Sequence, residues 1–536
     1  MLRSGESMSS STVLLFAGAV FGIVAAVLGA YGFTGRALVI GVDLGTTFSA
    51  IAYAARKGQP IVAPGMDGTA SLASIIAVSG GTFVVGRDAE ASVTDEPWSA
   101  VFDAKRVIGR RLDDPVTIVE RHRHGGRIVP HPNAFRNHFG KRVPASKLST
   151  CAGCASDVAF VVRAPPGEDI SLANLAHHQC VDEGSLMSVA SLRRAAAEGA
   201  FELPARLAPG SADGDNAALP LLLLTPQAVG CILITALLER VRTAAGHATL
   251  TASVAAVPAD FSPSQREATR EAYARAGVTI SRMQFEPAAA ATAYGLHTRP
   301  DVGAVLVFDM GGGTTDVSVL YLQDGAFTVI GSAGDGHLGG EDFDDCLLRV
   351  IGSQLRSIAG SSAGKYDVAA LTSVANEVML AAADDNNSDD GAASAPISLK
   401  RPAAPTHALC GLAWLKHEAE RVKIALSRDG TSGAPVAANW WCMTETARNV
   451  TSTITRDEFE GSCDPLFRRT LEPVRTALSN ANVAADEVDE VVLVGGSSRL
   501  PRVRDLLRDF LRRRDGLRHT VDPDLAVAIG AALVID

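Results

Sequence analysis

The chain of 536 residues is poor in aromatic residues and in cysteine, and it lacks two common nucleotide-binding patterns. Aromatic side chains make up 5% of the sequence, and no basic stripe with interleaved aromatics occurs, which disfavours nucleic-acid binding. No G-x-x-x-x-G-K-[ST] pattern is present, which argues against a P-loop nucleotidase. No G-x-G-x-x-G opens a helix after the first apolar strand, which argues against a Rossmann-type site.

The eight cysteines are too few for a disulfide scaffold of this length. Cys151 and Cys154 form a C-x-x-C pair, with His177, His178 and Cys180 downstream. In an oxidising compartment we expect a local disulfide, and a structural zinc site is the alternative. Two N-x-S/T sequons, which begin at Asn386 and Asn449, fit a lumenal location.

The remaining composition is that of a soluble, multidomain protein with an apolar leader. The net charge is −10, from 49 basic and 59 acidic residues, and 47% of the residues are hydrophobic. This length favours two or more domains. Residues 13–33 form a nearly unbroken apolar run, close to the roughly 20 residues that span a bilayer. We therefore predict a signal peptide or signal anchor over residues 1–36, which inserts into or crosses a membrane, with cleavage left open.

Two glycine turns of the same design lie some 270 residues apart. The apolar run at 38–42 is followed by Asp43, Gly45, Thr46 and Thr47, and the run at 304–308 is followed by DMGGGTTD at 309–316. Glycines let backbone N–H groups approach phosphate oxygens, and threonine hydroxyls add donors. An Asp at the end of each strand can hold hydrated Mg²⁺. Either turn alone could be an ordinary hairpin, but together they predict two halves that close over one phosphate-bearing ligand. The residues assigned to phosphate and metal are Asp43, Gly45, Thr46, Thr47, Asp309, Gly311, Gly312, Gly313 and Thr314.

A third glycine turn follows the apolar strand at 491–494 and precedes a helix. Its glycines could admit a flat purine, with an arginine over the face of the base. A tight strand–helix turn is the simpler interpretation of this segment alone. Beside the other two turns we interpret it as a base pocket, made by Gly495, Gly496, Ser497 and Arg499.

Between these turns the chain alternates regular and irregular stretches. We expect strands at 38–42, 51–54, 75–78 and 83–85, and a variable, partly ordered region at about 116–220. Helices are predicted to start at Thr225–Pro226 and at Ser262, because a capping residue is followed by proline at each. Residues 384–409 are acidic and proline-rich, which predicts a solvated loop.

The motifs in this order resemble the nucleotide-binding domain of the DnaK, or seventy-kilodalton heat-shock, chaperone family. The segments that carry the resemblance are Val42–Thr47, Phe102–Arg106 with Ile108–Arg110, Val257–Ala259 with Phe261, Glu286–Pro287 with Ala289–Ala291, Asp309–Asp316, His337–Asp344 and Val494–Arg499. The resemblance implies an α/β, actin-like (ribonuclease H-like) ATPase of two lobes. It places lobe I at 37–300 with the insertion at about 116–220, lobe II at 301–521 with the loop at about 384–409, and a C-terminal helix at 522–536 that returns to lobe I.

The resemblance also implies roles for single residues in binding ATP or ADP with Mg²⁺. Lys105, Glu286, Asp309 and Thr314 would be catalytic, with Lys105 stabilising the transferring phosphoryl group and Glu286 orienting water. Asp43, Asp309 and Asp316 would serve the metal. Glu420, Lys423 and Ser427 would hold the ribose and adenine, and Asp524 would complete the pocket with Gly496 and Arg499.

The chain departs from the family pattern at several places. Ile424 stands where most members carry an arginine, Asp260 replaces an aromatic residue, and Ala288 replaces a threonine. The sequence stops after the last nucleotide-domain helix, so we expect no peptide-binding domain. Together with the apolar leader and the ending at 521–527, this resembles the Stch-like microsomal stress-70 ATPase cores. The resemblance therefore implies the endoplasmic reticulum lumen, with co-chaperones, exchange factors and client proteins as partners.

Three functions remain open from the sequence. The leading hypothesis is a slow stress-70 type ATPase that acts in protein folding or quality control. A nucleotide-dependent scaffold with little or no turnover is the alternative. A small-molecule kinase of the actin-like superfamily is disfavoured, because no motif supplies a catalytic Asp for an acceptor.

Overall fold

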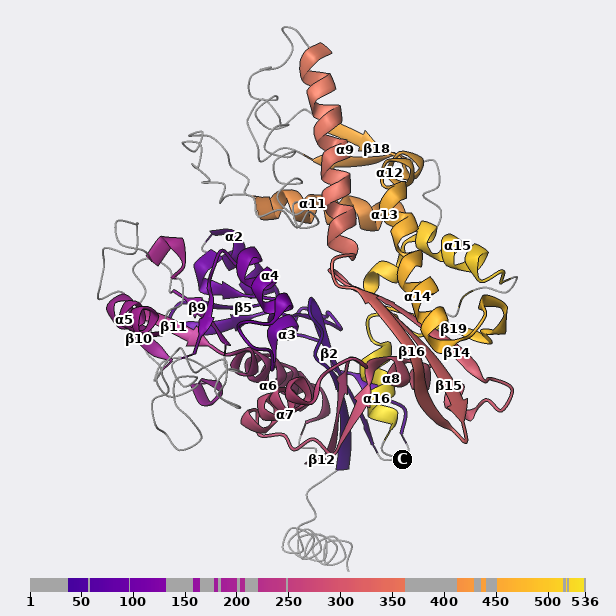
Figure 1. The fold of residues 1–536 in the computed structure, drawn as a ribbon, viewed down its shortest axis with the longest axis horizontal. Helices are drawn as coiled ribbons and strands as arrows, with labels where there is room; N and C mark the ends of the chain where they lie inside the picture. The colour runs from indigo at the N-terminus through magenta and orange to yellow at the C-terminus, as the bar shows by residue number, and fades with distance from the viewer. Residues whose placement is uncertain are drawn as a thin grey trace, which may run out of the picture.

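The computed structural model describes residues 37–55, 58–95, 97–131, 158–163, 178–181, 185–199, 203–207, 220–246, 249–361, 412–428, 435–439, 451–513, 517 and 520–534. The apolar leader, the Cys151–Cys154 pair, the asparagines of both sequons and the loop at 384–409 lie outside these residues. Within the described part, no helix combines the length and hydropathy needed to cross a membrane. Figure 1 shows the first half of the chain, in indigo to magenta, beside the second half, in salmon to yellow.

The first half contains a mixed sheet centred on β1 (Ala37–Asp43). β1 pairs in parallel with β12 (Thr249–Val257) and antiparallel with β2 (Phe48–Ala55). The apolar side chains from Leu38 to Val42 are buried, which is why this run forms a central strand. The predicted strands at 38–42 and 51–54 are confirmed. The sheet is completed by β13 (Arg282–Phe285), β3 (Ile61–Val62) and β4 (Leu72–Ala73).

The second half repeats this arrangement around β14 (Ala304–Met310). β14 pairs antiparallel with β15 (Thr315–Gln323) and in parallel with β19 (Glu490–Val494). β16 (Ala326–Asp335) forms the edge beyond β15. Both glycine turns therefore connect a central strand to its antiparallel neighbour, and each begins at the carboxyl end of the central strand.

Two short helices, α8 (Glu286–Ala293) and α16 (Ala526–Leu533), join the two sheets. One hydrophobic cluster extends from Val254 of the first sheet through Ala289 and Ala531 to Val305 of the second. The approach is close, because a Cβ atom on Gly530 would lie 1.7 Å from the carbonyl oxygen of Ala289. The small residues of these helices thus let two sheets share one core (Figure 1).

Both predicted helix starts are confirmed by their caps. α6 (Pro226–Ala245) begins after Thr225, whose Oγ1 accepts a hydrogen bond from the Ala228 N–H at 3.2 Å. α7 (Pro263–Arg275) begins after Ser262, which forms a reciprocal capping box with Gln265. Such caps satisfy N–H groups that have no partner within the helix, so these starts can be read from local sequence.

The region predicted to be variable contains a four-stranded sheet that was not predicted. β8 (Ile128–Pro130), β9 (Val158–Val162), β10 (Leu186–Ser188) and β11 (Pro220–Leu224) pair in the order β10–β11–β9–β8, and α5 (Val189–Gly199) packs against them. β9 is buried along its whole length. The strands are only three to five residues long and far apart in the sequence, so they are too short to show the alternation of apolar and polar residues that predicts a strand.

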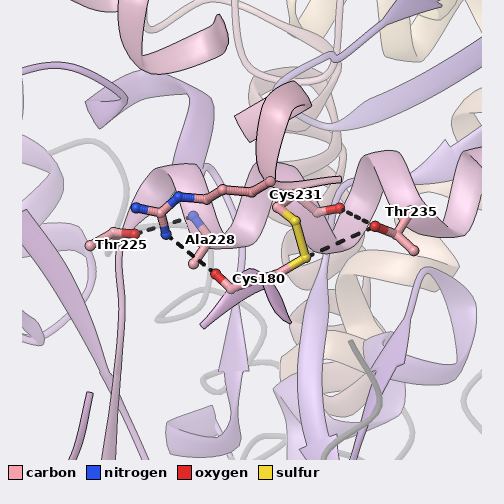
Figure 2. The surroundings of a disulfide bond; sticks show 6 residues. Cys180, Thr225, Ala228, Cys231 and Thr235 are labelled. Carbon is pink, nitrogen blue, oxygen red and sulfur yellow. Dashed lines mark hydrogen bonds between the residues drawn. A yellow bond between two sulfur atoms is a disulfide. The ribbon is translucent and has the colours of Figure 1, made fainter. Parts of the chain in front are cut away.

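A disulfide between Cys180 and Cys231 fastens this region to α6 (Figure 2). Both cysteines are fully buried. The Thr235 hydroxyl donates to the Cys231 carbonyl oxygen at 2.8 Å, inside the helix. Because Cys180 is bonded to Cys231, its sulfur is not available as a zinc ligand. The alternative of a zinc site with Cys151 and Cys154 therefore has no third cysteine from this position.

The first half also contains a small three-stranded sheet with short helices beside it and after it. A small sheet has the order β6 (Thr82–Val85), β5 (Ile76–Ser79), β7 (Ala100–Val101), and α2 (Arg87–Asp95) lies beside it. The short helix α3 (Ala104–Val107) follows β7, and α4 (Pro115–Arg123) follows α3.

The outer part of the second half is helical and built around aromatic residues. Phe343 packs against Phe467 at 4.6 Å between ring centroids and against Phe459 at 6.4 Å. A second disulfide, Cys346–Cys463, closes this core. The elements are α9 (Gly340–Ser361), α11 (Leu412–Ser427), β17 (Val436–Asn439), β18 (Thr451–Ile454), α12 (Arg456–Ser462), α13 (Asp464–Arg469), α14 (Leu471–Ala481) and α15 (Pro501–Phe510).

Candidate nucleotide site

The first and second glycine turns touch each other. A Cβ atom on Gly312 would lie 2.7 Å from Oγ1 of Thr47, so the two turns meet only because Gly312 has no side chain. A Cβ atom on Gly339 would in turn lie 2.3 Å from the carbonyl oxygen of Gly312. The predicted convergence of turns far apart in the sequence is therefore present in the structure.

Two buried serines, Ser49 and Ser74, form hydrogen bonds to the backbone of the first turn. The Gly45 N–H donates to Oγ of Ser49 at 3.2 Å, and Oγ of Ser74 donates to the Gly45 carbonyl oxygen at 2.9 Å. The two hydroxyls lie 2.8 Å apart, and the Ser74 N–H donates to the Thr47 carbonyl oxygen at 2.8 Å. The turn is thus fixed by buried polar contacts as well as by its glycine.

Lys105 and Glu286 form an ion pair beside these turns. The Lys105 Nζ lies 2.7 Å from Oε1 of Glu286, and each side chain is only 14% exposed. Burial acts to lower the pKa of Lys105, but the charges of Glu286 and Asp43 prevail and hold that pKa above its usual range. The ammonium therefore stays charged. Leu44, Gly45 and Thr46 line a small cavity together with Lys105.

Three aspartates predicted to serve the metal lie in the same electrostatic environment. Burial, followed by the charge of Glu286, raises the pKa of Asp43 to about 7 and that of Asp316 to about 6. The pKa of Asp309 lies well above its usual range for the same two reasons. A hydrogen bond from Thr314 acts in the opposite direction on Asp316, whereas Asp260, at a position where the sequence departs from the family pattern, adds to the increase.

This donor set fits a magnesium ion. Beside the effect of burial, the charge of Glu286 raises the pKa of Asp43, Asp309 and Asp316, and the charge of Lys105 lowers all three. Mg²⁺ takes oxygen ligands, is held by one or two carboxylates, and keeps several waters. A divalent cation would offset both the burial and the neighbouring negative charge that raise these pKa values.

The third glycine turn lies against the second. Gly495 has φ of 78°, and a Cβ atom there would lie 2.3 Å from the Met310 carbonyl oxygen and 2.8 Å from Oδ1 of Asp309. Ser497, in the single turn of 3₁₀ helix η9 (Gly496–Arg499), faces Gly340, whose added Cβ would lie 2.4 Å from the Ser497 Oγ. All three predicted turns are therefore neighbours.

Lys423, one of the residues expected to hold the ribose and adenine, contacts two other residues of the same chain. Its buried Nζ lies 2.7 Å from Oδ2 of Asp344 and donates to the Gly340 carbonyl oxygen at 2.9 Å. Burial raises the pKa of Asp344 to about 7, and Lys423 acts against this increase. The Ser427 Oγ donates to the Lys423 carbonyl oxygen at 2.7 Å, within α11. Lys423 thus joins α11 to α9, and the ligand contacts of Glu420, Lys423 and Ser427 stay predictions.

Arg499 is placed by two aspartates. Its NH2 pairs with Asp522 and lies 3.0 Å from Oδ2 of Asp524. Burial raises the pKa of Asp524, and Arg499 opposes this increase. Gly496 lies against the same carboxylate, because a Cβ atom there would be 2.9 Å from the Asp524 Oδ1. The structure therefore brings together Gly496, Arg499 and Asp524, while contact of Arg499 with a base stays a prediction.

Three residues that were not predicted to belong to the site contact the turns, namely Ser49, Ser74 and Arg106. Arg106 follows Lys105 in the Phe102–Arg106 motif, so that motif was the available signal. The two serines had none, because isolated serines near strands are common.

The duplicated strand–Asp–turn arrangement, with three glycine turns around one Lys–Glu pair and a carboxylate cluster, defines a nucleotide-binding ATPase of the actin-like type. The comparison with known families agrees. A family model described as Hsp70 protein matches residues 39–135, 213–379 and 408–536, which is more than half of the chain. The chain belongs to the Hsp70 family. Members of this family are chaperones with an actin-like ATPase, bind ATP or ADP with Mg²⁺, and work with co-chaperones and client proteins.

Proposed function

We propose that this chain hydrolyses ATP to ADP and phosphate between its three glycine turns, as the ATPase of a stress-70 type chaperone. The observation that carries the proposal is the buried Lys105–Glu286 ion pair at 2.7 Å, beside Asp43, Asp309 and Asp316. A charged lysine fixed by a carboxylate, next to turns free of side chains, suits a phosphoryl group that must be positioned and neutralised.

Each part of the site has a distinct task in this reaction. The threonine hydroxyls of Thr46, Thr47 and Thr314 and the backbone of the glycine turns bind phosphate oxygens. Lys105 stabilises negative charge on the transferring phosphoryl group, and Glu286 orients Lys105 and the attacking water. Bound Mg²⁺ supplies charge neutralisation on the phosphates. Catalysis by positioning alone, without a dedicated strong base, predicts slow turnover.

Phosphate release from the full-length protein tests the proposal. We expect Lys105→Ala and Glu286→Ala each to lower kcat by about 100-fold, the size seen when one electrostatic contact to a transition state is removed. Arg270→Ala is the matched control, because it breaks only an exposed ion pair with Glu267 at 3.3 Å on α7. Unchanged release in both site variants would show that the assigned chemistry is wrong.

A nucleotide-dependent scaffold is the second candidate, and Ile424 is the observation that favours it. This side chain is 47% exposed on α11, one residue after Lys423, at the position where the family pattern has an arginine. Loss of a cation–π contact would weaken nucleotide binding, and an exposed apolar side chain suits a protein partner. A partner whose binding depends on nucleotide, and that is retained by Lys105→Ala, would support a scaffold over an enzyme.

We further propose that the protein belongs with the Stch-like microsomal stress-70 ATPase cores and serves protein folding or quality control in the endoplasmic reticulum lumen. The resemblance of residues 521–527 supports the subfamily. The two disulfides, Cys180–Cys231 and Cys346–Cys463, support an oxidising compartment. Protease protection and glycan shift on isolated membranes test the location, since a cytosolic protein would be digested and carry no glycan.

A further inference from the structure

Arg106 reaches from the first half of the chain to two backbone carbonyls of the second. Its NH1 donates to the Gly336 carbonyl oxygen at 2.9 Å, and its NH2 donates to the Gly313 carbonyl oxygen at 3.3 Å. Gly313 belongs to the second glycine turn, and Gly336 precedes α9. Arg106 itself is the residue after Lys105 on α3, so one short helix carries both side chains.

On its own side, Arg106 is held by two carboxylates. Its Nε lies 3.8 Å from Oδ2 of Asp103 and 3.8 Å from Oε1 of Glu120, and its side chain is 9% exposed. Burial raises the pKa of Asp103 to about 7, and Arg106 is the main influence acting against that increase. The guanidinium thus bridges the half-buried Asp103, the buried Glu120 and two carbonyl groups.

The same acids, with His124, have the composition of a metal site, since their ligand atoms lie within 4.8 Å of one another. The charges around them argue against a metal ion. Arg106 already lies near both carboxylates, and the NH1 of Arg123 lies 3.6 Å from Glu120. A further cation would meet these guanidinium groups, so the cluster serves better as the anchor of Arg106.

Gly313 is shaped to receive this side chain. A Cβ atom on Gly313 would lie 2.5 Å from the Arg106 NH2. The third glycine of DMGGGTTD therefore makes room for an arginine, whereas Gly312 makes room for Thr47. A single hydrogen bond at Gly313 also orients the next N–H group, because the peptide unit to Thr314 is planar and trans.

We propose that Arg106 is a positioning residue, which sets the second phosphate-binding turn against the first half of the protein and fixes the direction of the Thr314 amide. The proposal rests on the proposed ATPase function for its catalytic consequence, but its structural consequence exists without nucleotide. Two charge-assisted hydrogen bonds from one planar group hold two loops in one relative position.

Amide hydrogen exchange in the full-length, nucleotide-free protein tests the structural part. We expect Arg106→Gln to speed exchange of the amides at 311–316 and 336–338 by about ten-fold, the loss of one charged hydrogen bond. Arg110→Gln is the matched control, because Arg110 pairs with Asp114 at 3.1 Å within the first half only. Equal exchange in the wild type and Arg106→Gln would overturn the proposal.

Kinetics with ATP tests the catalytic part. Arg106→Gln should raise KM by about ten-fold, since two aligned turns must bind one ligand, and Arg106→Lys should recover part of this loss because it keeps the charge but reaches one carbonyl. Gly313→Ala displaces the same contact from the other side, so its effect and that of Arg106→Gln should be less than additive. Fully additive effects would overturn the proposal. Faster exchange in a protein that releases no phosphate even as wild type would support Arg106 as a positioning residue and count against the ATPase.

Discussion

His124 should make the first half of the protein sensitive to acid. It lies at the carboxyl end of α4, 3% exposed, between Phe102 at 4.6 Å and Phe160 at 5.3 Å between ring centroids. Burial lowers the pKa of His124 from 6.5 to about 3, and the charges of three arginines, Arg127, Arg123 and Arg106, act in the same direction. Asp103 and Glu120 are the acids that face it.

The direction of the effect follows from proton binding. The unfolded chain takes up a proton on His124 near pH 6.5, whereas the folded protein resists protonation until about pH 3. The contribution of neutral His124 to the free energy of unfolding is therefore complete above pH 6.5, and it is lost as the pH falls from 6.5 to 3. Linkage gives a loss of about 2 kcal/mol at pH 5 and about 4 kcal/mol at pH 3.

The variant His124→Phe keeps an aromatic ring in the same place but removes the titration. Urea unfolding between pH 7.5 and 4.5, followed by tryptophan fluorescence, should show a smaller acid loss in His124→Phe than in the wild type, by about 2 kcal/mol at pH 5. His122→Phe replaces an exposed imidazole of the same helix and should follow the wild type. Parallel pH curves for the wild type and His124→Phe would refute the reasoning.

Two further predictions concern stability. The Cys346–Cys463 disulfide joins cysteines 117 residues apart, so replacing both by alanine should lower the free energy of unfolding by about 3–5 kcal/mol. Urea unfolding of this variant and of the wild type, both without reductant, measures the loss, and equal midpoints would contradict this. Gly530→Ala would place a Cβ atom 1.7 Å from the Ala289 carbonyl oxygen. This overlap should lower the free energy of unfolding by about 1–3 kcal/mol or more. Gly461→Ala, in a helix with open space around it, should leave the melting temperature within about 2 °C of the wild type; equal melting of both variants would sink the argument.

The features that could be predicted from the sequence are those with local or duplicated signals. Thr225 and Ser262 start helices because the cap and the residues it satisfies lie within three positions. The convergence of the turns at Asp43 and Asp309 could be predicted because the same motif occurs twice, and a repeated strand–turn design suggests a repeated fold.

The features that could not be predicted depend on contacts distant in the sequence. The partner of Cys180 is 51 residues away, and no spacing rule selects Cys231. Arg106 contacts carbonyl groups 207 and 230 residues away. Every residue has a backbone carbonyl, so the sequence does not indicate which ones accept from Arg106. Short strands such as β10 are stabilised by their neighbours rather than by their own sequence pattern.

The position of α16 has a consequence for how the protein is made. A Cβ atom on Gly41 would lie 2.2 Å from the backbone nitrogen of Ala532, so the first strand described is covered by a helix that is translated much later. While the ribosome is still elongating, the face of that sheet that carries Ala50 and Ala52 lacks its cover, Ala528 and Ala532. This face of the nascent first half therefore stays uncovered until residues 526–533 emerge, and apolar surface exposed in that interval favours aggregation.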